Sequence, residues 1–247
     1  MEPSQSQPAQ PTESPQPTQP PSAAPQVVTP EVPATWPGAW GLYKYSKTTV
    51  KFNLETILVL CILNLVVGGV FYALLGNAGR LGGNLVGAFL DMALTFAYLA
   101  SVRGQKISLG QAFGKCDPML YLKFLANTIL VGIGLAISLL LLVVPFFFVL
   151  PRVLLAPFFL LDKGMGPYAA ITASWDATKG HTGMIWGVIG ATLAMALLMV
   201  TIIGIPFSLY FLFMYGASSV LVYEYITHLA LQATTAPAPQ TPSQPTV

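Results

Sequence analysis

Two ionisable residues, Asp91 and Arg152, interrupt long apolar stretches of this sequence. Asp91 lies six residues in from the start of the stretch 85–100, and Arg152 lies seven in from the start of 145–161. At a rise of about 1.5 Å per residue, both would lie about 10 Å below the outer end of a membrane helix. Ionisable groups are costly at that depth. We therefore expect an Asp91–Arg152 ion pair, either a structural clasp or a substrate or ion site; two unpaired groups reaching toward the headgroups are the third alternative.

The elements that carry these two residues are predicted to be membrane-spanning helices. A helix needs about 20 apolar residues to cross a bilayer, and the chain offers six such stretches: 57–75, 85–100, 124–144, 145–161, 184–203 and 207–223. Hydrophobic residues make up 54% of the chain and charged residues 8%, and the mean hydropathy is +0.67, which excludes the ordinary soluble classes. The sequence predicts an all-α integral membrane protein with six transmembrane helices.

Both ends of the chain differ from this membrane domain, which we place at 44–232. Residues 1–43 contain eleven Pro, six Gln and no Lys or Arg, and residues 233–247 are rich in Pro and Thr. Such segments cannot bury enough apolar surface to offset the entropy of ordering. We expect both to be disordered tails.

Basic residues are distributed unevenly between the two sides of the predicted helices. With both termini on one side, nine of the eleven Lys and Arg residues lie on that side, and the other two are Arg80 and the embedded Arg152. Lys and Arg are enriched on the cytoplasmic side of membranes. We therefore expect a multi-pass protein of a cytoplasmic membrane with both termini in the cytoplasm.

The landmarks of the sequence recur about every sixty residues. Asp162 and Glu224, which close two successive predicted hairpins, are 62 residues apart, and Asp91 and Arg152 are 61 apart. Because all three hairpins would enter from the same side, the pattern predicts three parallel repeats, each a cytoplasmic segment followed by a helical hairpin. The alternative is that six spans with short outer loops produce this period by chance.

Two of the cytoplasmic segments have the pattern of helices that lie at the membrane interface. Ser108 and Gln111 form a capping-box pattern that begins a short helix. The second segment, 167–179, places a proline at its first position and an apolar stripe beside a polar one. Its interfacial residues are predicted to be Tyr168, Ile171, Trp175 and Lys179. Such a helix lies flat at the headgroups, docks on the ends of the spans, or does both.

Prolines are predicted to break the membrane helices, because proline removes a backbone hydrogen bond. The breaks are expected at Pro145, Pro151, Pro157 and Pro206. Pro145 and Pro206 are 61 residues apart, in agreement with the repeat. Broken helices with an embedded charge occur in transporters, although proline is also common in structural membrane helices.

A more specific pattern covers residues 152–180. It contains Arg152, an Ala-Pro-Phe span, the loop Asp-Lys-Gly-Met-Gly-Pro, and Ser-Trp-Asp-Ala-Thr-Lys-Gly. This segment resembles the bacterial multi-span family that includes the membrane domain of glycerophosphoryl diester phosphodiesterases. The six-span outline over 45–230 is consistent with it, although Thr172 and Ala173 stand where that family often has basic residues. The soluble catalytic barrel is missing from this sequence, so the resemblance implies a bacterial inner-membrane protein without that enzymatic activity.

The sequence offers no pattern for catalysis. His181 and His228 belong to no His-Glu-x-x-His motif, no serine elbow or phosphate loop occurs, and the two cysteines, Cys61 and Cys116, lack metal-site spacing. We expect no enzyme activity, cofactor, metal or nucleic-acid partner. The expected function is a non-catalytic role in envelope or membrane organisation, with membrane lipids as partners. A small transporter that uses the Asp91/Arg152 region and a lipid-binding accessory subunit of a membrane enzyme are the alternatives, and a protein partner or homo-oligomer stays open.

Overall fold

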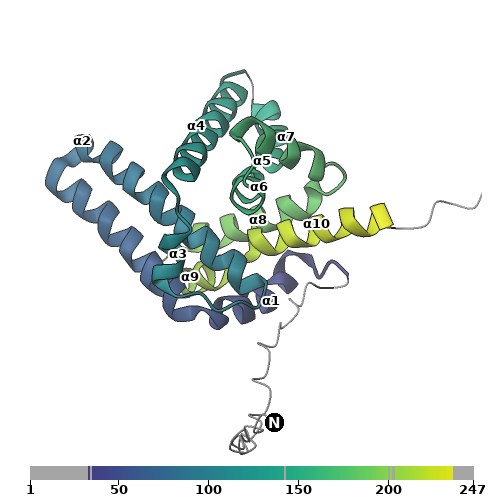
Figure 1. Ribbon diagram of the computed structural model, residues 1–247, viewed down its shortest axis with the longest axis horizontal. Coiled ribbons are helices and arrows are strands. Elements are labelled where there is room, and N and C mark those ends of the chain that lie inside the picture. Colours follow the sequence, from purple (N-terminus) through teal and green to yellow (C-terminus); the bar gives the residue numbers. More distant parts are fainter. Residues whose placement is uncertain (1–32, 34, 142, 200, 202–203, 236–247) are drawn as a thin grey trace, which may run out of the picture.

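The computed structural model of this chain describes residues 33, 35–141, 143–199, 201 and 204–235, and the regular elements in that part are all helices (Figure 1). They are α1 (Gly38–Phe52), α2 (Leu54–Val102), α3 (Leu109–Gly114), α4 (Pro118–Leu141), α5 (Val143–Val153), α6 (Ala156–Lys163), α7 (Pro167–Ala177), α8 (Thr182–Leu198), α9 (Gly204–Tyr215) and α10 (Ser218–Thr235). The predicted all-α fold is confirmed.

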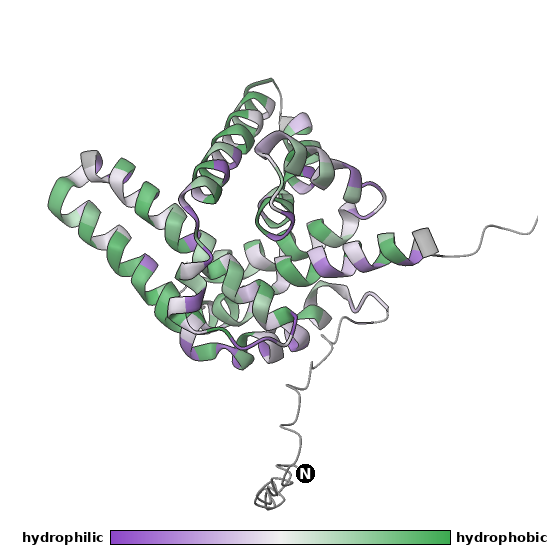
Figure 2. Cartoon of the chain, viewed as in Figure 1, coloured by the Kyte–Doolittle hydropathy of each residue, from purple (hydrophilic) through white to green (hydrophobic). Residues whose placement is uncertain are grey.

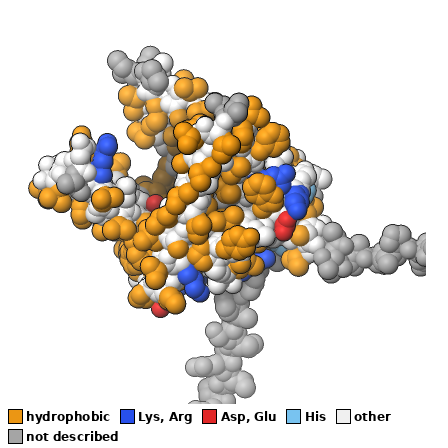
Figure 3. Space-filling view, turned by 90° about the horizontal axis from the view of Figure 1, so that it is seen from above, with side chains coloured by type: hydrophobic (Ala, Val, Ile, Leu, Met, Phe, Trp, Pro, Cys, Tyr) orange, Lys and Arg blue, Asp and Glu red, His pale blue; other side chains and the backbone are white. Residues whose placement is uncertain are grey.

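The helices include several membrane spans. Five described segments are long and apolar enough to cross a bilayer: Leu54–Asn77, Gly79–Val102, Pro118–Leu141, Val144–Lys163 and Gly204–Gln232. A sixth span results if α7 and α8, which meet at a bend of 102°, count as one. Hydrophobic residues predominate along these segments in Figure 2, and many of their apolar side chains are exposed, with Leu140 of α4 89% exposed. Figure 3 shows hydrophobic side chains over much of one face of the molecule. A surface of this kind is stable in lipid rather than in water, so this is a multi-pass membrane protein.

The first hairpin is a single run, α2, that folds back at Gly76. Gly76 has φ +54° and ψ −134°, a conformation that L side chains rarely adopt. The second span therefore begins at Gly79, six residues before the expected position. Gly82 allows this tight return, because a Cβ there would lie 2.8 Å from the ring of Phe71 on the first span. The glycines thus form part of the packing inside the hairpin.

The first two hairpins meet at one end of the molecule and diverge toward their turns. In Figure 1 the turn of α2 points to the left, whereas the far end of α4 points to the top. The opposite end of the spans carries the loops around 103–108, 164–166 and 178–181, and we call it the convergent end.

Three shorter helices join the hairpins in a ring at the convergent end. Helix α3, which precedes the second hairpin, packs on α2, and α7, which precedes the third hairpin, packs on α4, α5 and α6. Helix α1, which precedes the first hairpin, contacts α8, α9 and α10 of the third as well as α2. Each short helix therefore packs on the preceding hairpin, and α1 closes the ring.

The boundary of the amino-terminal tail differs from the prediction. Residues 1–32 and 236–247 lie outside the described residues, but 38–43, assigned to the tail, form the first turns of α1. The reason is tertiary packing: Leu42 is fully buried, and the ring of Tyr43 stacks on Phe211 at 5.0 Å between ring centroids. The far end of α10 likewise extends into the predicted tail, to Thr235.

The docking of α3 predicts the reactivity of Cys116. Burial raises the pKa of this thiol to about 11, so very little thiolate forms at neutral pH. In a Cys61→Ala background, we expect alkylation of Cys116 to be slow at pH 8 and to accelerate as the pH rises toward 11. A denatured control should react with a pKa of about 8.5. Equal rates for folded and denatured protein at pH 8 would show that α3 is not docked.

Candidate functional site

A cluster of charged side chains lies at the convergent end and takes one residue from each hairpin. Arg103 follows α2, Asp162 lies in α6, and Glu224 lies in α10. Arg103 Nη1 lies 2.6 Å from Asp162 Oδ1, and Arg103 Nε lies 2.7 Å from Glu224 Oε1. One guanidinium therefore bridges two carboxylates, an arrangement that suits the several donors of its planar fork.

The surroundings of this charge cluster fix its geometry. The Arg103 side chain is 35% exposed, whereas those of Asp162 and Glu224 are 16% and 9% exposed. Tyr223 donates its hydroxyl to the second oxygen of Asp162 at 2.8 Å. Hydrogen bonding to Asp162 raises the pKa of Arg103 above its ordinary value, so the guanidinium stays charged. With Asp162 bonded by two residues, the cluster is a structural joint.

Sequence reasoning did not predict the charge cluster. Asp162 and Glu224 were expected at equivalent places, but Arg103 was interpreted only as a basic residue of a loop. The signal was its position at the end of the second span, directly before Gly104, just as Lys163 precedes Gly164. Both glycines have positive φ values of +66° and +64°, which end the helices at comparable points.

Two further joints lie where even-numbered spans are interrupted. The fourth span is interrupted between Val153 and Ala156. The sixth is interrupted between Tyr215 and Ser218, and each of these two residues lies 62 positions after its counterpart in the fourth span. At each break a carbonyl loses its helical partner and needs another donor.

Serines of the short helices supply these donors. Ser174 of α7 donates its hydroxyl to the carbonyl of Arg152, and Ser46 of α1 donates to the carbonyl of Met214, each at 2.6 Å. Both serines are fully buried. In α3 the residue 62 positions before Ser174 is Ala112, which carries no hydroxyl, and the second span, Gly79–Val102, has no such break. The two broken spans thus pair with a serine and the unbroken span with an alanine. Ser46 lies 66 rather than 62 residues before Ala112, so the three-fold repeat stays a prediction.

The predicted proline breaks are located differently from the expectation. Pro145 and Pro206 each lie two residues inside the start of a helix, α5 and α9, where a missing N–H is tolerated. Pro151 lies within α5 without dividing it. Pro157 lies in the first turn of α6, directly after the break, and removes the donor that the carbonyl of Val153 would need. Pro157 is therefore the one of the four at an internal break of a span.

Asp91 is bound within its own hairpin. Asn64 of the first span donates its side-chain amide to Asp91 Oδ1 at 2.6 Å. Thr95 donates its hydroxyl to the backbone carbonyl of Asp91 at 2.7 Å, one turn further along. The Asn64–Asp91 contact joins the two halves of α2 and provides Asp91 with a neutral donor.

Arg152 is bound to α7. Its guanidinium lies 5.0 Å from the centre of the Trp175 ring, and its Nη1 donates to the Trp175 carbonyl at 3.4 Å. Together with the Ser174 bond to the Arg152 carbonyl, these contacts fasten α7 to α5. An arginine over the face of a tryptophan is a favourable cation–π pair.

The expected Asp91–Arg152 ion pair is therefore corrected. Within the described part of the chain the ion pairs are Arg103–Asp162, Arg103–Glu224 and Asp176–Lys179. Asp91 and Arg152 belong to hairpins that diverge, and each is held by neutral partners nearer in space. Equal depth and opposite charge were visible in the sequence, whereas the splay of the hairpins was not.

Helix α7 begins at Pro167 as predicted and ends at Ala177, before the turn that Gly180 completes with φ +81°. The face that packs on the bundle is made of small residues, since Ala170 and Ser174 are fully buried. The predicted apolar stripe faces the other way: Tyr168 is 78% exposed, Trp175 is 37% exposed and Ile171 is half-buried. Lys179, also exposed, pairs with Asp176 at 2.6 Å.

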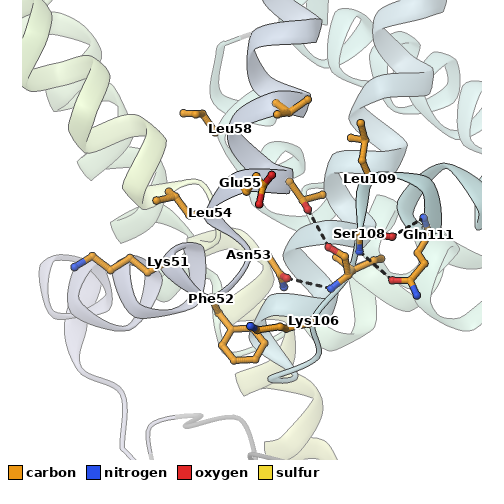
Figure 4. Close-up of a pocket in the computed structure, with 13 residues that line it drawn as sticks. Lys51, Phe52, Asn53, Leu54, Glu55, Leu58, Lys106, Ser108, Leu109 and Gln111 are labelled. Atoms are coloured by element: carbon orange, nitrogen blue, oxygen red, sulfur yellow. Dashed lines mark hydrogen bonds between the residues drawn. The ribbon is translucent and has the colours of Figure 1, made fainter.

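A cavity of about 980 Å³ lies at the junction of α1, α2 and α3 (Figure 4). Asn53 forms its floor: its amide donates to Ser101 Oγ and the Gln105 carbonyl at 2.8 Å each, and its oxygen accepts from Ile107 N at 3.0 Å. The cavity is lined by polar and apolar side chains, among them Lys51, Lys106, Glu55, Leu54, Leu58 and Leu109. Lysines beside leucines, at the point where a span begins, match the chemistry of a membrane interface.

Comparison with known proteins adds no identification: no protein-family model, curated protein or solved structure matches this chain.

Replacing Arg103 tests the charge cluster. Arg103→Gln leaves two mostly buried carboxylates close together, and we expect a loss of about 1–3 kcal/mol in stability, below the ~3–5 kcal/mol of a fully buried pair because Arg103 is partly exposed. Arg103→Lys should lose less. Thermal unfolding in detergent measures the effect, with Lys179→Gln, at an exposed pair, as the control expected within about 0.5 kcal/mol. Equal melting temperatures for Arg103→Gln and Lys179→Gln would contradict the joint.

Removing a serine donor tests the joints at the broken spans. Ser174→Ala and Ser46→Ala each strand a buried carbonyl, which should cost about 1–3 kcal/mol. Thr172→Ala is the matched control, since Thr172 lies on the exposed face of α7 and donates only to the Tyr168 carbonyl in its own helix. In detergent, the free energy of unfolding of both serine variants should be well below that of the Thr172 variant. Equal free energies of unfolding for all three variants would refute the role of the serines.

Proposed function

We propose that this protein is a non-catalytic component of a bacterial inner membrane that organises the cytoplasmic leaflet through the helices at its convergent end. The observation that carries the proposal is the ring of α1, α3 and α7, which uses one face of each helix for the bundle. On the outside, α1 exposes Trp40 and Lys44, and α7 exposes Tyr168 and Trp175. A ring of this kind suits the lipid headgroup layer, where amphipathic side chains are most stable.

Helix α1 shows this division clearly. Leu42, Ser46 and Val50 are buried against the bundle, whereas Trp40 is 57% exposed and Lys44 is exposed. Tyr215 donates its hydroxyl to the carbonyl of Ala39 at 2.8 Å, so the helix is fixed and not free to insert alone. The outward side chains are therefore presented by a rigid support.

The cavity at the start of α2 supports the same proposal. Lys51 and Lys106 contribute two positive charges to its lining and Glu55 one negative charge, beside apolar residues that continue into the first span. This combination suits a phosphate near the lysines and acyl chains along the leucines.

The location of Trp175 tests the interfacial placement of α7. In a variant that keeps only this tryptophan, with Trp36, Trp40 and Trp186 changed to Phe, we expect strong quenching by lipids brominated near the headgroup and weak quenching by iodide. A tryptophan peptide in water is the control. Iodide quenching of Trp175 as efficient as that of the peptide would refute the proposal.

The orientation is tested by thiol labelling in intact cells. In a variant without Cys61 and Cys116, we expect an impermeant maleimide to label Asn77→Cys, at the turn of α2, and not Ser108→Cys, at the convergent end. Both positions are exposed, so accessibility differs only by the side of the membrane. Labelling of Ser108→Cys from outside would reverse the orientation. A solute flux abolished by Asp91→Asn would instead favour transport.

A further inference from the structure

A small cavity beside Arg152 lies on the lipid-facing side of the second hairpin. Its volume is about 210 Å³, and its lining comes from α5 and the start of α8: Phe147, Phe148, Pro151, Arg152, Thr182 and Trp186. Phe148 is 66% exposed, and the ring centroids of Phe147 and Trp186 are 5.3 Å apart. The cavity thus combines an arginine and a hydroxyl with aromatic walls that open toward lipid.

The charge of Arg152 is not neutralised by the described part of the chain. Its guanidinium contacts the Trp175 ring and carbonyl, and the described carboxylates form no ion pair with it. A guanidinium has five donors, and its hydrogen bond to the Trp175 carbonyl is long, at 3.4 Å. In a membrane helix an uncompensated arginine draws an anion or water toward itself.

We propose that the Arg152 cavity binds the phosphate of an anionic phospholipid. The guanidinium donates to the phosphate oxygens, the Thr182 hydroxyl is a second donor, and the acyl chains lie along Phe147 and Phe148. Trp175 holds the guanidinium in place from the α7 side, so the lipid joins α5, α7 and α8. This inference rests on the proposed function, because it requires the convergent end to lie in the headgroup layer, and it names the site and the charge of the lipid.

The lining favours a phospholipid over a soluble anion. Four of the six lining residues are aromatic or proline, and two of these, Phe147 and Phe148, are among the exposed apolar residues of the chain. A soluble anion would gain the arginine and hydroxyl contacts but would leave this apolar surface uncovered. An anionic lipid makes the arginine and hydroxyl contacts and also covers the apolar surface.

Trp186 reports on the occupant of the cavity. In a variant with Trp36, Trp40 and Trp175 changed to Phe, which keeps an aromatic ring and a backbone carbonyl beside Arg152, reconstituted in phosphatidylcholine vesicles, we expect brominated phosphatidylglycerol to quench Trp186 more strongly than brominated phosphatidylcholine at equal mole fraction. Arg152→Gln should reduce the relative affinity for phosphatidylglycerol about fivefold. Arg152→Lys should keep part of the preference. Arg80→Gln, which removes an arginine at the opposite end of the spans, should leave it unchanged.

The outcomes separate this inference from the proposed function. No preference for phosphatidylglycerol in the parent protein, or a preference unchanged in Arg152→Gln, overturns the lipid site; headgroup-level quenching of Trp175 would then still support the proposed function. Displacement of phosphatidylglycerol by millimolar inorganic phosphate would identify a soluble anion and also overturn it. If Arg152→Gln does not fold, Thr182→Val provides the second test, with a smaller loss of preference expected and an unchanged preference contradicting the site.

Discussion

The bridge from Arg103 to Asp162 and Glu224 is the interaction on which the arrangement of the three hairpins depends. Apolar burial alone does not position helices in lipid, because lipid chains are as apolar as the side chains that would pack. A guanidinium shared by two carboxylates is directional, and here each of its three members comes from a different hairpin. The convergent end is therefore specified by polar contacts, while the turn ends diverge with their apolar residues exposed to lipid.

The serine joints and the charge cluster both hold helices together toward the convergent end. Ser46 and Ser174 satisfy carbonyls where spans break, and these bonds also fix α1 to the third hairpin and α7 to the second. Tyr98 of the second span approaches the break at Gly216 so closely that a Cβ there would collide with its hydroxyl. The breaks are thus contact points between helices of different hairpins, and the short helices that cross them carry the lipid-facing residues of the proposed function.

The sequence predicted the features that depend on composition and local pattern. Hydropathy identified the membrane helices, the capping box of Ser108 and Gln111 is present in α3, and Pro167 begins α7. Contacts between residues that are distant in the sequence were harder to predict. The depth of Asp91 and Arg152 suggested a pair, but depth does not specify which faces of two helices meet. The role of Arg103 was missed because the enrichment of basic residues on the cytoplasmic side already accounts for an arginine at the end of a span.

The most direct test of this account is whether α1 closes the ring on the third hairpin of the same chain. A Cβ at Gly187 of α8 would lie 3.1 Å from the Cβ of Ala39, slightly closer than the roughly 3.5–4.5 Å of disulfides, so that a shift of a few tenths of an ångström would allow the bond. With Cys61 and Cys116 replaced by Ala, we expect Ala39→Cys and Gly187→Cys to form an intramolecular disulfide under mild oxidation, detected by mass spectrometry of the digested monomer. Ala39→Cys with Gly110→Cys, in α3, should form none. A monomer in which the two introduced thiols of the first pair stay free, or disulfides found only between chains, would contradict the closed ring.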